Sequence, residues 1–437
     1  MLRPESAVLG GLFLLSGSLA GLTADPQVSA ETTAEQVFVP ELGISANPAA
    51  VNRMTGNGEF VRWLGLKKDS GVFLGGVWVG NSNYVISGGE EPGAWSWNSL
   101  LIVSMGLHLD ELVGWKGGKF GLEFLQFNGE YTNSEAGSVQ AYNGTGGPEP
   151  YNRTELSQLW IRQELFDGKV IVRVGKMAPT VDFNNVVRPV PTQDAARAIP
   201  SVSGLIFTPL FKNPTLIGVL PGSYNTACGV TTTLAPTDDM YLSYGFFDGS
   251  GVNGVQTGRN GPQFNGYYFN IWEAGLAWEL GRDKLPGSFG IGGWYQTGLL
   301  KGNGVTENGA AGMYCFGSQR LWLRDPDKDN SGVSGYFQLG ANNSNVLPFN
   351  HYFGMGLTAF GLVPQRPQDS FGAGMAWSWL NPREYERPSE LMFQTYYQAH
   401  LVAGTYLQPV ISYIPTPGAG ADLAPAWTAT VQVTVLF

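Results

Sequence analysis

The chain has 437 residues, which is enough for two or three soluble domains or for one large closed sheet. Only 14% of the residues are charged, 61 are glycine, and the net charge of −10 argues against nucleic-acid binding. A barrel that spans a membrane keeps charge off a broad outer band, so this composition favours such a barrel over a soluble all-β protein.

The N-terminal segment has the features of a secretory signal. A single Arg precedes an apolar run over residues 7–22, and small residues at 22–24 or 28–30 offer a cleavage site. Gly and Ser interrupt the run, which is also short for a membrane-spanning helix. We predict a signal peptide over residues 1–30, with its cleavage site left open, and a turn-rich periplasmic lead-in over residues 31–58.

From residue 59 onward the chain is a series of short segments in which apolar and polar residues alternate. Successive side chains of a strand point to opposite faces, so each segment has one apolar face. The clearest segments lie at residues 72–80, 101–109, 120–124, 242–246, 272–280, 289–296, 333–341, 353–362, 371–379, 391–401, 406–414 and 427–437. We estimate about sixteen to eighteen in all, and bacterial barrels have even strand numbers. Residues 59–437 are therefore predicted to form an all-β, transmembrane antiparallel β-barrel of sixteen strands.

The clearest hairpin spans residues 156–177. Apolar residues alternate with Arg162 and Glu164 before Asp167-Gly168, which predicts a two-residue turn, and three valines alternate with Arg173 after it. An arginine that faces lipid near the membrane centre costs about 2–4 kcal/mol. The valines are therefore expected to face outward and the charged residues to face the lumen.

Residues 178–225 do not show the alternating pattern of apolar and polar residues. Seven prolines fall in the segment, which strand interiors would not tolerate, and it also carries Arg188 and Arg197. A long irregular segment of this kind is usually functional or disordered. On the residues alone, a loop folded into the lumen and an ordinary surface loop remain equally open.

The last strand has the length and pattern of a membrane strand. Its apolar face begins at Trp427 and ends at Phe437, and its other face carries Thr and Gln. An outer-membrane strand needs about 9 to 11 residues with aromatic residues at both interfaces. We expect this strand to contact outer-membrane lipid and, through Phe437, the barrel-assembly machinery.

Catalysis has no support in the sequence. The three histidines lie far apart, and no nucleophile, zinc-protease or phosphate-loop motif occurs. We therefore predict that the protein is not an enzyme and has no organic cofactor. Cys228 and Cys315 could pair in an oxidising compartment, but two separate thiols are favoured.

One segment has part of a calcium-loop pattern. Asp327, Asp329 and Ser331 place oxygens at positions 1, 3 and 5, and Gly332 stands at position 6. Position 12 is Gln338 where a calcium loop has Glu, and the flanking segments look like strands. A plain hairpin turn is therefore favoured over a metal site.

Several inward positions suit a neutral polar solute such as a sugar. Alternation places Glu273 opposite an outward Trp face, and it places Trp294 and Gln296 on the lumen side of their strand. Fixed polar groups can replace water around a sugar, and aromatic rings can support its apolar faces. With Arg162, Glu164 and Arg173, these residues would supply donors and acceptors without strong selection for one ion charge.

A succession of short motifs resembles the carbohydrate-selective porin family of the OprB type. These are LWIRQELFDGKVIVRVGKM followed by DFN, then YGFFDGS, GIGGWYQTG, GLTAFGLVPQRPQDSFGAG and LQPVISYI. The resemblance implies a sixteen-stranded outer-membrane barrel that passes glucose and other small sugars by diffusion. It also implies inward-folded constriction loops, which favours entry of residues 178–225, with Arg188 and Arg197, into the lumen.

The resemblance also implies site residues. The matching motifs carry Arg162, Arg173, Lys176, Asp182, Glu273, Trp294, Arg366 and Asp369. One departure stands out, because the family often has Pro-Gly-Arg-Pro where this chain has Pro364-Gln365-Arg366-Pro367. The turn there lacks a flexible glycine.

The sequence thus predicts an outer-membrane porin of a Gram-negative bacterium for small neutral carbohydrates. The alternatives are a general diffusion porin for small solutes and, in another class, a secreted β-rich carbohydrate-binding protein. The recurrent outward Leu, Val, Phe and Trp disfavour the secreted protein, because its exterior would have to suit water. Monomer and homo-oligomer remain open, since barrel interfaces are as apolar as lipid contacts.

Overall fold

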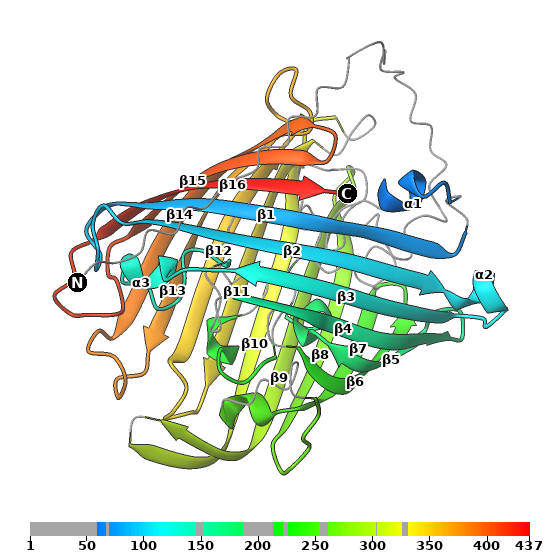
Figure 1. Ribbon diagram of the computed structural model, residues 1–437, viewed down its shortest axis with the longest axis horizontal. Coiled ribbons are helices and arrows are strands. Elements are labelled where there is room, and N and C mark those ends of the chain that lie inside the picture. Colours follow the sequence, from blue (N-terminus) through cyan, green and yellow to red (C-terminus); the bar gives the residue numbers. More distant parts are fainter. Residues whose placement is uncertain are drawn as a thin grey trace, which may run out of the picture. The chain divides into compact units, whose positions relative to one another are not determined.

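In the computed structural model of the chain, the residues that can be described are 59–66, 70–145, 152–184, 186, 213–221, 226–253, 261–302, 304–325 and 331–437. All of them belong to one compact unit, Glu35–Phe437. Sixteen antiparallel strands form a closed barrel, in which each strand pairs with its neighbours in the chain and β16 pairs with β1 (Figure 1). The predicted strand number is confirmed. The predicted signal peptide and lead-in, residues 1–58, lie outside the described residues.

The strands are β1 (Val72–Ser87), β2 (Trp95–His108), β3 (Gly118–Asn128), β4 (Asn152–Leu165), β5 (Val170–Met177), β6 (Ala227–Thr237), β7 (Met240–Asp248), β8 (Tyr268–Leu280), β9 (Leu285–Gly302), β10 (Val305–Leu323), β11 (Gly332–Asn342), β12 (Phe349–Phe360), β13 (Ser370–Leu380), β14 (Ser389–Val402), β15 (Thr405–Ile414) and β16 (Ala426–Leu436). Short helices are α1 (Glu59–Trp63), α2 (Leu109–Val113), α3 (Thr132–Glu135), η3 (Pro179–Val181), η6 (Pro214–Leu216) and η7 (Ser250–Asn253). None of the helices in the described ranges is long and apolar enough to cross a membrane.

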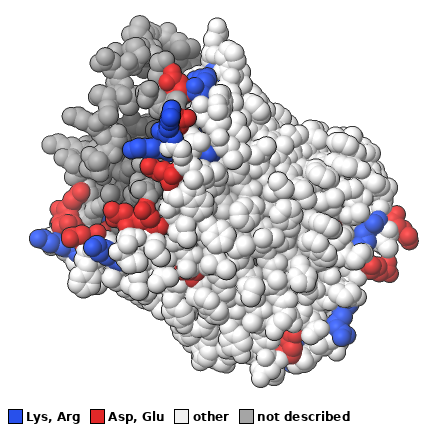
Figure 2. Space-filling model, turned by 180° about the vertical axis from the view of Figure 1, so that it is seen from behind, with Lys and Arg blue, Asp and Glu red and all other residues white. Residues whose placement is uncertain are grey.

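The outer face of the barrel is apolar along nearly every strand. In β16, Trp427 and Val431 are exposed, whereas Thr428 and Thr430 are buried on the lumen side. Figure 2 shows most acidic and basic side chains near two edges of the molecule, with a broad uncharged band between them. The alternation predicted from the sequence therefore sets which face meets lipid.

The connections differ between the two ends of the barrel. Tight turns at residues 238–239, 281–284 and 403–404 lie at the end where the chain finishes, which we call the turn end. The other end, the loop end, carries loop L2 (residues 129–151), loop L3 (residues 178–226) and loop L8 (residues 415–425). In outer-membrane barrels the short turns face the periplasm and the long loops face the exterior.

The hairpin between β4 and β5 differs from the prediction in its turn. Leu165 pairs with Val170, so four residues reverse the chain where two were predicted. Phe166, Asp167 and Gly168 all have positive φ angles, of 54°, 56° and 81°. Asp-Gly was recognised correctly as a left-handed pair, but the preceding Phe166 adopts the same conformation and lengthens the turn.

The barrel is sealed where its last residue meets its first strand. The Gly76 amide donates to the Phe437 carbonyl at 2.8 Å, and the Phe437 amide donates to the Gly76 carbonyl at 3.0 Å. A side-chain carbon on Gly76 would lie 2.4 Å from the Phe437 ring, so glycine makes room for that ring. The Phe60 ring lies 4.6 Å from the Phe437 ring, centroid to centroid.

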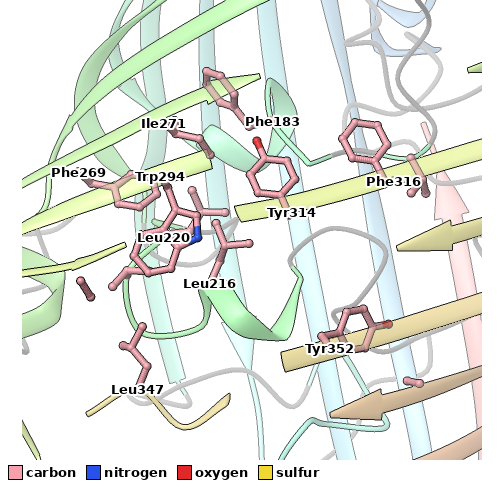
Figure 3. Close-up of a cluster of buried hydrophobic side chains, with 14 of the residues drawn as sticks. Phe183, Leu216, Leu220, Phe269, Ile271, Trp294, Tyr314, Phe316, Leu347 and Tyr352 are labelled. Atoms are coloured by element: carbon pink, nitrogen blue, oxygen red, sulfur yellow. The ribbon is translucent and has the colours of Figure 1, made fainter. Parts of the chain in front are cut away.

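A hydrophobic cluster fills one side of the lumen. The described ends of L3 contribute Phe183, Leu216 and Leu220, which pack with inward residues of β8 to β10 and β12 (Figure 3). The strand residues of this cluster include Phe269, Ile271, Trp294, Tyr314, Phe316 and Tyr352. L3 therefore enters the lumen at both of its described ends, as the family resemblance implied, and residues 187–212 lie outside the described residues.

The two cysteines are free thiols on different strands. Cys228 lies on β6 and Cys315 on β10, and neither belongs to the inward-facing set of its strand. Separate thiols were favoured over a disulfide, and the structure agrees.

Candidate functional site

Charged side chains line one wall of the lumen, on the inward positions of β3 to β5. The set comprises Lys119, Glu123, Arg153, Glu155, Arg162, Glu164 and Arg173, and Asp182 of L3 joins it. We call this surface the charged wall. Its residues lie in three groups, which follow one another from the turn end to the loop end.

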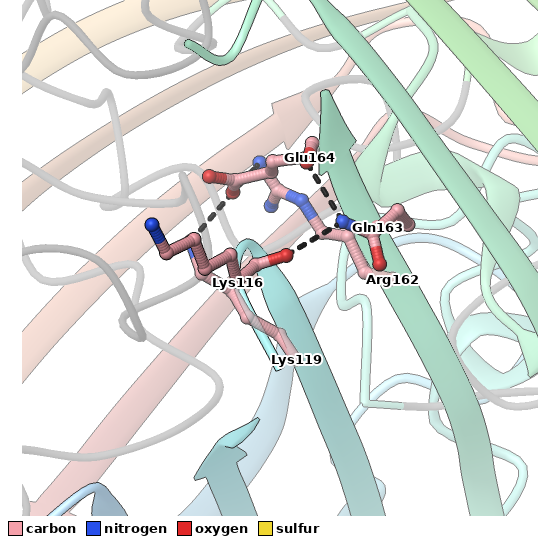
Figure 4. A network of polar contacts seen from close by, with 5 residues as sticks. All are labelled: Lys116, Lys119, Arg162, Gln163 and Glu164. Carbon is pink, nitrogen blue, oxygen red and sulfur yellow. Dashed lines mark hydrogen bonds and ion pairs between the residues drawn. The ribbon is translucent and has the colours of Figure 1, made fainter. Parts of the chain in front are cut away.

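The first group lies near the turn end, where two cations share one carboxylate. The Lys119 ammonium lies 2.5 Å from the Glu164 carboxylate, and the Arg162 guanidinium lies 3.0 Å from the same oxygen (Figure 4). Arg162 and Glu164 both keep part of their side-chain surface open to solvent. They can therefore present a donor and an acceptor to a solute in the lumen.

The second group lies near the middle of the wall. The Arg173 guanidinium contacts the Asp182 carboxylate and also lies over the Trp160 ring, 5.4 Å from its centroid. Trp160 faces inward and is partly exposed. A side-chain carbon on Gly121 would lie 2.3 Å from its ring, so this glycine lets the indole lie against the wall. The result is a ring face and a guanidinium plane held together.

The third group continues the wall to the loop end. The Ser157 hydroxyl donates to the Glu123 carboxylate at 2.8 Å, at a point where the pairing of β3 and β4 shifts register. Beyond it, Arg153 lies 3.7 Å from Glu155, measured from Nε to Oε1. The same guanidinium lies 5.7 Å from the centre of the Phe127 ring.

The charged wall is balanced in charge. It carries four cations (Lys119, Arg153, Arg162 and Arg173) and four anions (Glu123, Glu155, Glu164 and Asp182) among the residues that the structure describes. In each of the three groups, cations and anions are interspersed along the path. Lys119, Glu123 and Arg173 are buried in this wall, and the other five side chains are partly exposed.

Away from the charged wall, the described ends of L3 pack against inward residues of other strands. Glu273 on β8 is buried, and its carboxylate accepts hydrogen bonds from the Tyr241 hydroxyl at 2.6 Å, the Tyr314 hydroxyl at 2.9 Å and the Asn184 amide at 2.6 Å. Glu273 therefore anchors the first part of L3. The last part is held by Asn342, whose side chain donates to the Thr215 carbonyl at 2.9 Å. Both described ends of L3 are thus bonded to strand residues outside the charged wall.

Four predicted residues come together in this site. Arg162, Glu164 and Arg173 face the lumen as their alternation predicted, and Asp182 reaches Arg173 from L3. The structure contradicts the lumen-lining prediction for three others. Glu273, Trp294 and Gln296 face inward but are buried. The Asn184 amide of L3 donates to Glu273, Trp294 belongs to the hydrophobic cluster, and Gln296 donates to the Gly249 carbonyl between β7 and β8 at 3.2 Å.

The prediction is also wrong for Lys176. It alternates with Arg173 and Met177, which face inward, so it lies on the outer face, where its ammonium donates to the Leu156 carbonyl. The family motif placed it in the site, whereas the alternation of the neighbouring valines already placed it outside. Lipid-facing lysines commonly bend toward polar groups in this way.

Arg366 and Asp369 lie in the turn between β12 and β13, at the turn end. The Arg366 guanidinium lies 2.7 Å from the Asp369 carboxylate, which also accepts a hydrogen bond from the Tyr397 hydroxyl. Burial alone would raise the pKa of Asp369, but the hydrogen bonds from Arg366 and Tyr397 outweigh it and lower that pKa. Because Tyr397 alternates with the inward Tyr396 and Gln398, this cluster stabilises the turn and does not line the pore.

The remaining predicted positions fall largely outside the described residues. Arg188 and Arg197 of L3 do so, as do Asp327 and Asp329 of the calcium-loop pattern. Ser331 is described, and its hydroxyl accepts a hydrogen bond from Arg324 at 3.3 Å. Within the described ranges, no group of three His, Cys, Asp or Glu side chains could hold a metal ion.

Four residues of the charged wall and the neighbouring Trp160 were not predicted from the sequence. The four are Lys119, Glu123, Arg153 and Glu155. Glu123 stands between outward apolar residues of β3, and Trp160 stands between outward apolar residues of β4. Lys119 stands one position before an outward Phe, and Arg153 and Glu155 alternate with outward residues just ahead of the predicted hairpin. Extending the period-two pattern by a few residues at each strand end would have found them.

The comparisons with known proteins agree with this architecture. A family described as "Carbohydrate-selective porin, OprB family" matches residues 101–437. Porin B of Pseudomonas aeruginosa is 23% identical over 381 residues, which cover 76% of this chain and 81% of that protein. The high-pH structure of Pseudomonas putida OprB has a TM-score of 0.71 at 18% identity and covers 87% of this chain and 96% of that chain. The low-pH structure of the same protein has a TM-score of 0.54 at the same identity and coverage. The chain therefore belongs to the OprB family of carbohydrate-selective porins, which are proteins of the bacterial outer membrane.

Proposed function

We propose that small neutral carbohydrates such as glucose diffuse passively along the charged wall, across the outer membrane of a Gram-negative bacterium. The observation that carries this proposal is the balance of four cations and four anions on one continuous surface. A sugar hydroxyl both donates and accepts, so it can exchange partners with carboxylates and guanidinium groups as it moves. An anion or a cation would meet an unfavourable partner in each of the groups.

The partly exposed Trp160 adds a surface for the apolar face of a sugar ring. Its indole lies against Gly121, and Arg173 covers part of it, so its orientation is fixed before a solute arrives. Aromatic rings contribute apolar area in a defined direction, which polar groups cannot do. Stacking on Trp160 and hydrogen bonding to the neighbouring pairs would together favour a sugar over an amino acid of similar size.

The rest of the chain has supporting roles in this proposal. Residues 1–30 would direct export and be removed, and residues 31–58 would lie in the periplasm ahead of the barrel. The strand that ends at Phe437 would be the contact for the assembly machinery and lipid. The sugar passes unchanged, with no catalytic step and no cofactor.

The test is the swelling of liposomes that contain the refolded protein, with glucose compared with neutral and charged amino acids of similar size. Glucose is expected to enter fastest. Arg162→Gln should slow glucose entry by about two- to tenfold, which corresponds to one net hydrogen bond of about 0.5–1.5 kcal/mol. Trp160→Ala should lower the preference for glucose over the neutral amino acid.

Arg366→Gln is the matched control, because it removes another Arg paired with an acid, but in a turn outside the pore. It should leave all entry rates unchanged. If glucose enters no faster than amino acids of its size, general diffusion of small solutes replaces the sugar-selective function. Swelling by the Arg162 variant at the rate of the unaltered protein would remove the charged wall from the mechanism.

A further inference from the structure

Large apolar side chains are exposed outside the strands at the turn end of the barrel. They belong to three successive connections, which are the segment before β1, the β2–β3 connection and the β4–β5 turn. Trp63, Val113 and Phe166 keep 83%, 71% and 74% of their surfaces exposed. We call this set the apolar collar, and its members are Trp63, Leu64, Leu112, Val113, Trp115 and Phe166.

The first part of the collar is fixed to the outer face of the barrel at the pairing of β1 with β16. Phe437 continues the alternation of the outward Trp427 and Val431, so its ring lies on the lipid-facing side. The Phe60 ring of α1 packs on that ring, and the Trp63 ring lies 5.9 Å from the Phe60 ring, centroid to centroid. Figure 1 shows α1 close to the end of β16. α1 therefore continues the lipid-facing surface beyond the last strand.

The second part of the collar is fixed to the outer face of β3 and β4. A side-chain carbon on Gly118 would lie 3.1 Å from the Trp115 ring, and Gly118 alternates with the inward Lys119, so the ring lies on the outer side. The Trp115 indole N–H donates to the Gln163 side chain at 2.6 Å, and Gln163 donates to the Lys116 carbonyl at 2.9 Å. Trp115 thus has a satisfied polar atom and a ring fixed at the edge of the lipid-facing band.

α2 connects these two parts. The His108 amide donates to the Gly71 carbonyl at 2.7 Å, just ahead of β1. A side-chain carbon on Gly71 would lie 3.2 Å from Leu112, so the start of β1 and α2 are packed together. Leu112 is followed by Val113 and Trp115 in the same connection. The collar therefore follows the rim from the first strand to the outer face of β3.

Charged side chains lie between the apolar ones. Asp110 and Glu111 are exposed just ahead of Leu112 and Val113, and the exposed Lys116 follows Trp115. Lipid hydrocarbon would disfavour these charges, whereas the headgroup boundary of a bilayer accepts charged groups beside apolar ones and is enriched in Trp. The composition of the collar is that of an interfacial surface.

The rest of the turn end has a different character. The β6–β7 turn carries Asp238 and Asp239, and the β8–β9 turn reads Gly-Arg-Asp-Lys over residues 281–284. At residues 238–239, 281–284, 324–325, 361–369 and 403–404, all of which the structure describes, no large apolar side chain is exposed. The collar is thus confined to one side of the barrel.

We propose that the apolar collar is a membrane anchor that docks onto the headgroups and adjoining acyl chains of phospholipids in the periplasmic leaflet. A second copy of the chain and a periplasmic protein are the alternative occupants. Phospholipid is favoured because both fixed parts of the collar, at Phe60 and at Trp115, continue the face of the barrel that already meets lipid. Since the collar lies on one side, it holds the barrel deeper in this leaflet at β1–β3 than at β8–β9. The inference is independent of which solute the pore passes.

The experiment measures the depth of nitroxide spin labels in vesicles of phosphatidylethanolamine and phosphatidylglycerol. Cys228→Ala and Cys315→Ala remove the native thiols, and labels are then attached in Leu64→Cys or Val113→Cys. Asp283→Cys is the matched control, because Asp283 is exposed at the same end of the barrel but outside the collar. The ratio of collisions with oxygen to collisions with an aqueous nickel chelate should be several-fold higher at positions 64 and 113 than at position 283.

Equal ratios at the three positions would overturn the proposal, because the collar would then lie in water. A high ratio that falls when labelled protein is diluted with lipid would also overturn it, since a second copy would then be the occupant. If the labelled variants do not form SDS-resistant barrels, the unaltered protein is irradiated in vesicles that contain a phospholipid with a photoreactive group near its glycerol. Adducts are expected on residues 59–66 and 109–117, and equal labelling of residues 281–284 would contradict the one-sided anchor.

Discussion

Arg173 shows how a charged side chain can lie on the lumen side of a strand as a member of an ion pair. Its guanidinium contacts the Asp182 carboxylate, and the Trp160 ring covers one of its faces. Two opposite charges that form a pair remain good hydrogen-bonding groups, but their electrostatic potentials offset each other at a distance. The charged wall is built from such pairs.

Gln365 offers a test at the scale of one residue. Its φ angle is 63°, in the turn where the family often has glycine. A non-glycine residue pays roughly 1–2 kcal/mol in this conformation, and the freedom of glycine in the unfolded chain offsets about 0.5–1 kcal/mol. Gln365→Gly should therefore raise the free energy of unfolding by about 0.5–1 kcal/mol.

Urea unfolding of the barrel in lipid vesicles measures this difference. Gln365→Ala is the control and should give no gain, because alanine keeps the side-chain carbon that disfavours a positive φ. Equal gains in both variants would show that the amide side chain, and not the backbone conformation, carries the cost.

Alternation identified the lumen face correctly for Arg162, Glu164 and Arg173, because lipid strongly disfavours the opposite assignment. The same rule could not show that Trp294 and Gln296 are covered, since strand period says nothing of what packs on a face. Lys176 was misplaced where a family motif was preferred to the period of its own strand. The face of the sheet to which a side chain points can be read from its neighbours in the sequence. Whether that side chain is buried depends on residues far away in the chain.

At the scale of elements, two strands lack the pattern that reveals the others. β6 carries Thr at 231, 232 and 233, so its two faces look alike, and much of β10 has Gly, Ala and Ser on both faces. Hydrogen bonding to their neighbours defines both strands in the barrel. The total of sixteen could be estimated from chain length and pattern, but these boundaries could not.

Glu273 allows a test of L3 as an element. Its carboxylate accepts three hydrogen bonds, one of them from the Asn184 amide in L3. Each hydrogen bond to a charged group contributes about 1.5–3 kcal/mol. Glu273→Ala should release the first part of L3, and we expect a higher mean conductance with more current noise in single-channel recordings.

Glu279 supplies the matched control, since it is the other inward acid on β8 and lies near the turn end. Glu279→Ala should leave the current noise at its original level. If the current noise of the folded Glu273→Ala variant is unchanged, the hydrophobic cluster alone holds L3.

At the scale of the whole molecule, the sheet closes where β1 pairs with β16, and one end of this pairing has a very close approach. The Phe437 ring occupies the space above Gly76, and each residue donates its amide to the carbonyl of the other. Gly76→Ala would place a carbon 2.4 Å from both that ring and the Ile102 carbonyl. We expect it to reduce the fraction of protein that resists SDS without boiling.

Two further variants make this result specific. Phe437→Ala removes only the ring and should give a smaller loss of the SDS-resistant form. Gly251→Ala is the control, because no atom lies within 4 Å of the added carbon, and it should behave like the unaltered protein. A full yield from Gly76→Ala would show that the seam tolerates a different closure.

The pairing of β1 with β16 has a consequence for biosynthesis. β16 closes the sheet by pairing with β1, so a chain that lacks β16 retains two unpaired sheet edges. Such a chain cannot satisfy its backbone within lipid and remains a substrate for proteases. The pairing of β1 with β16 thereby makes membrane insertion depend on the presence of both strands, and deletion of residues 426–436 should abolish the channel instead of truncating it.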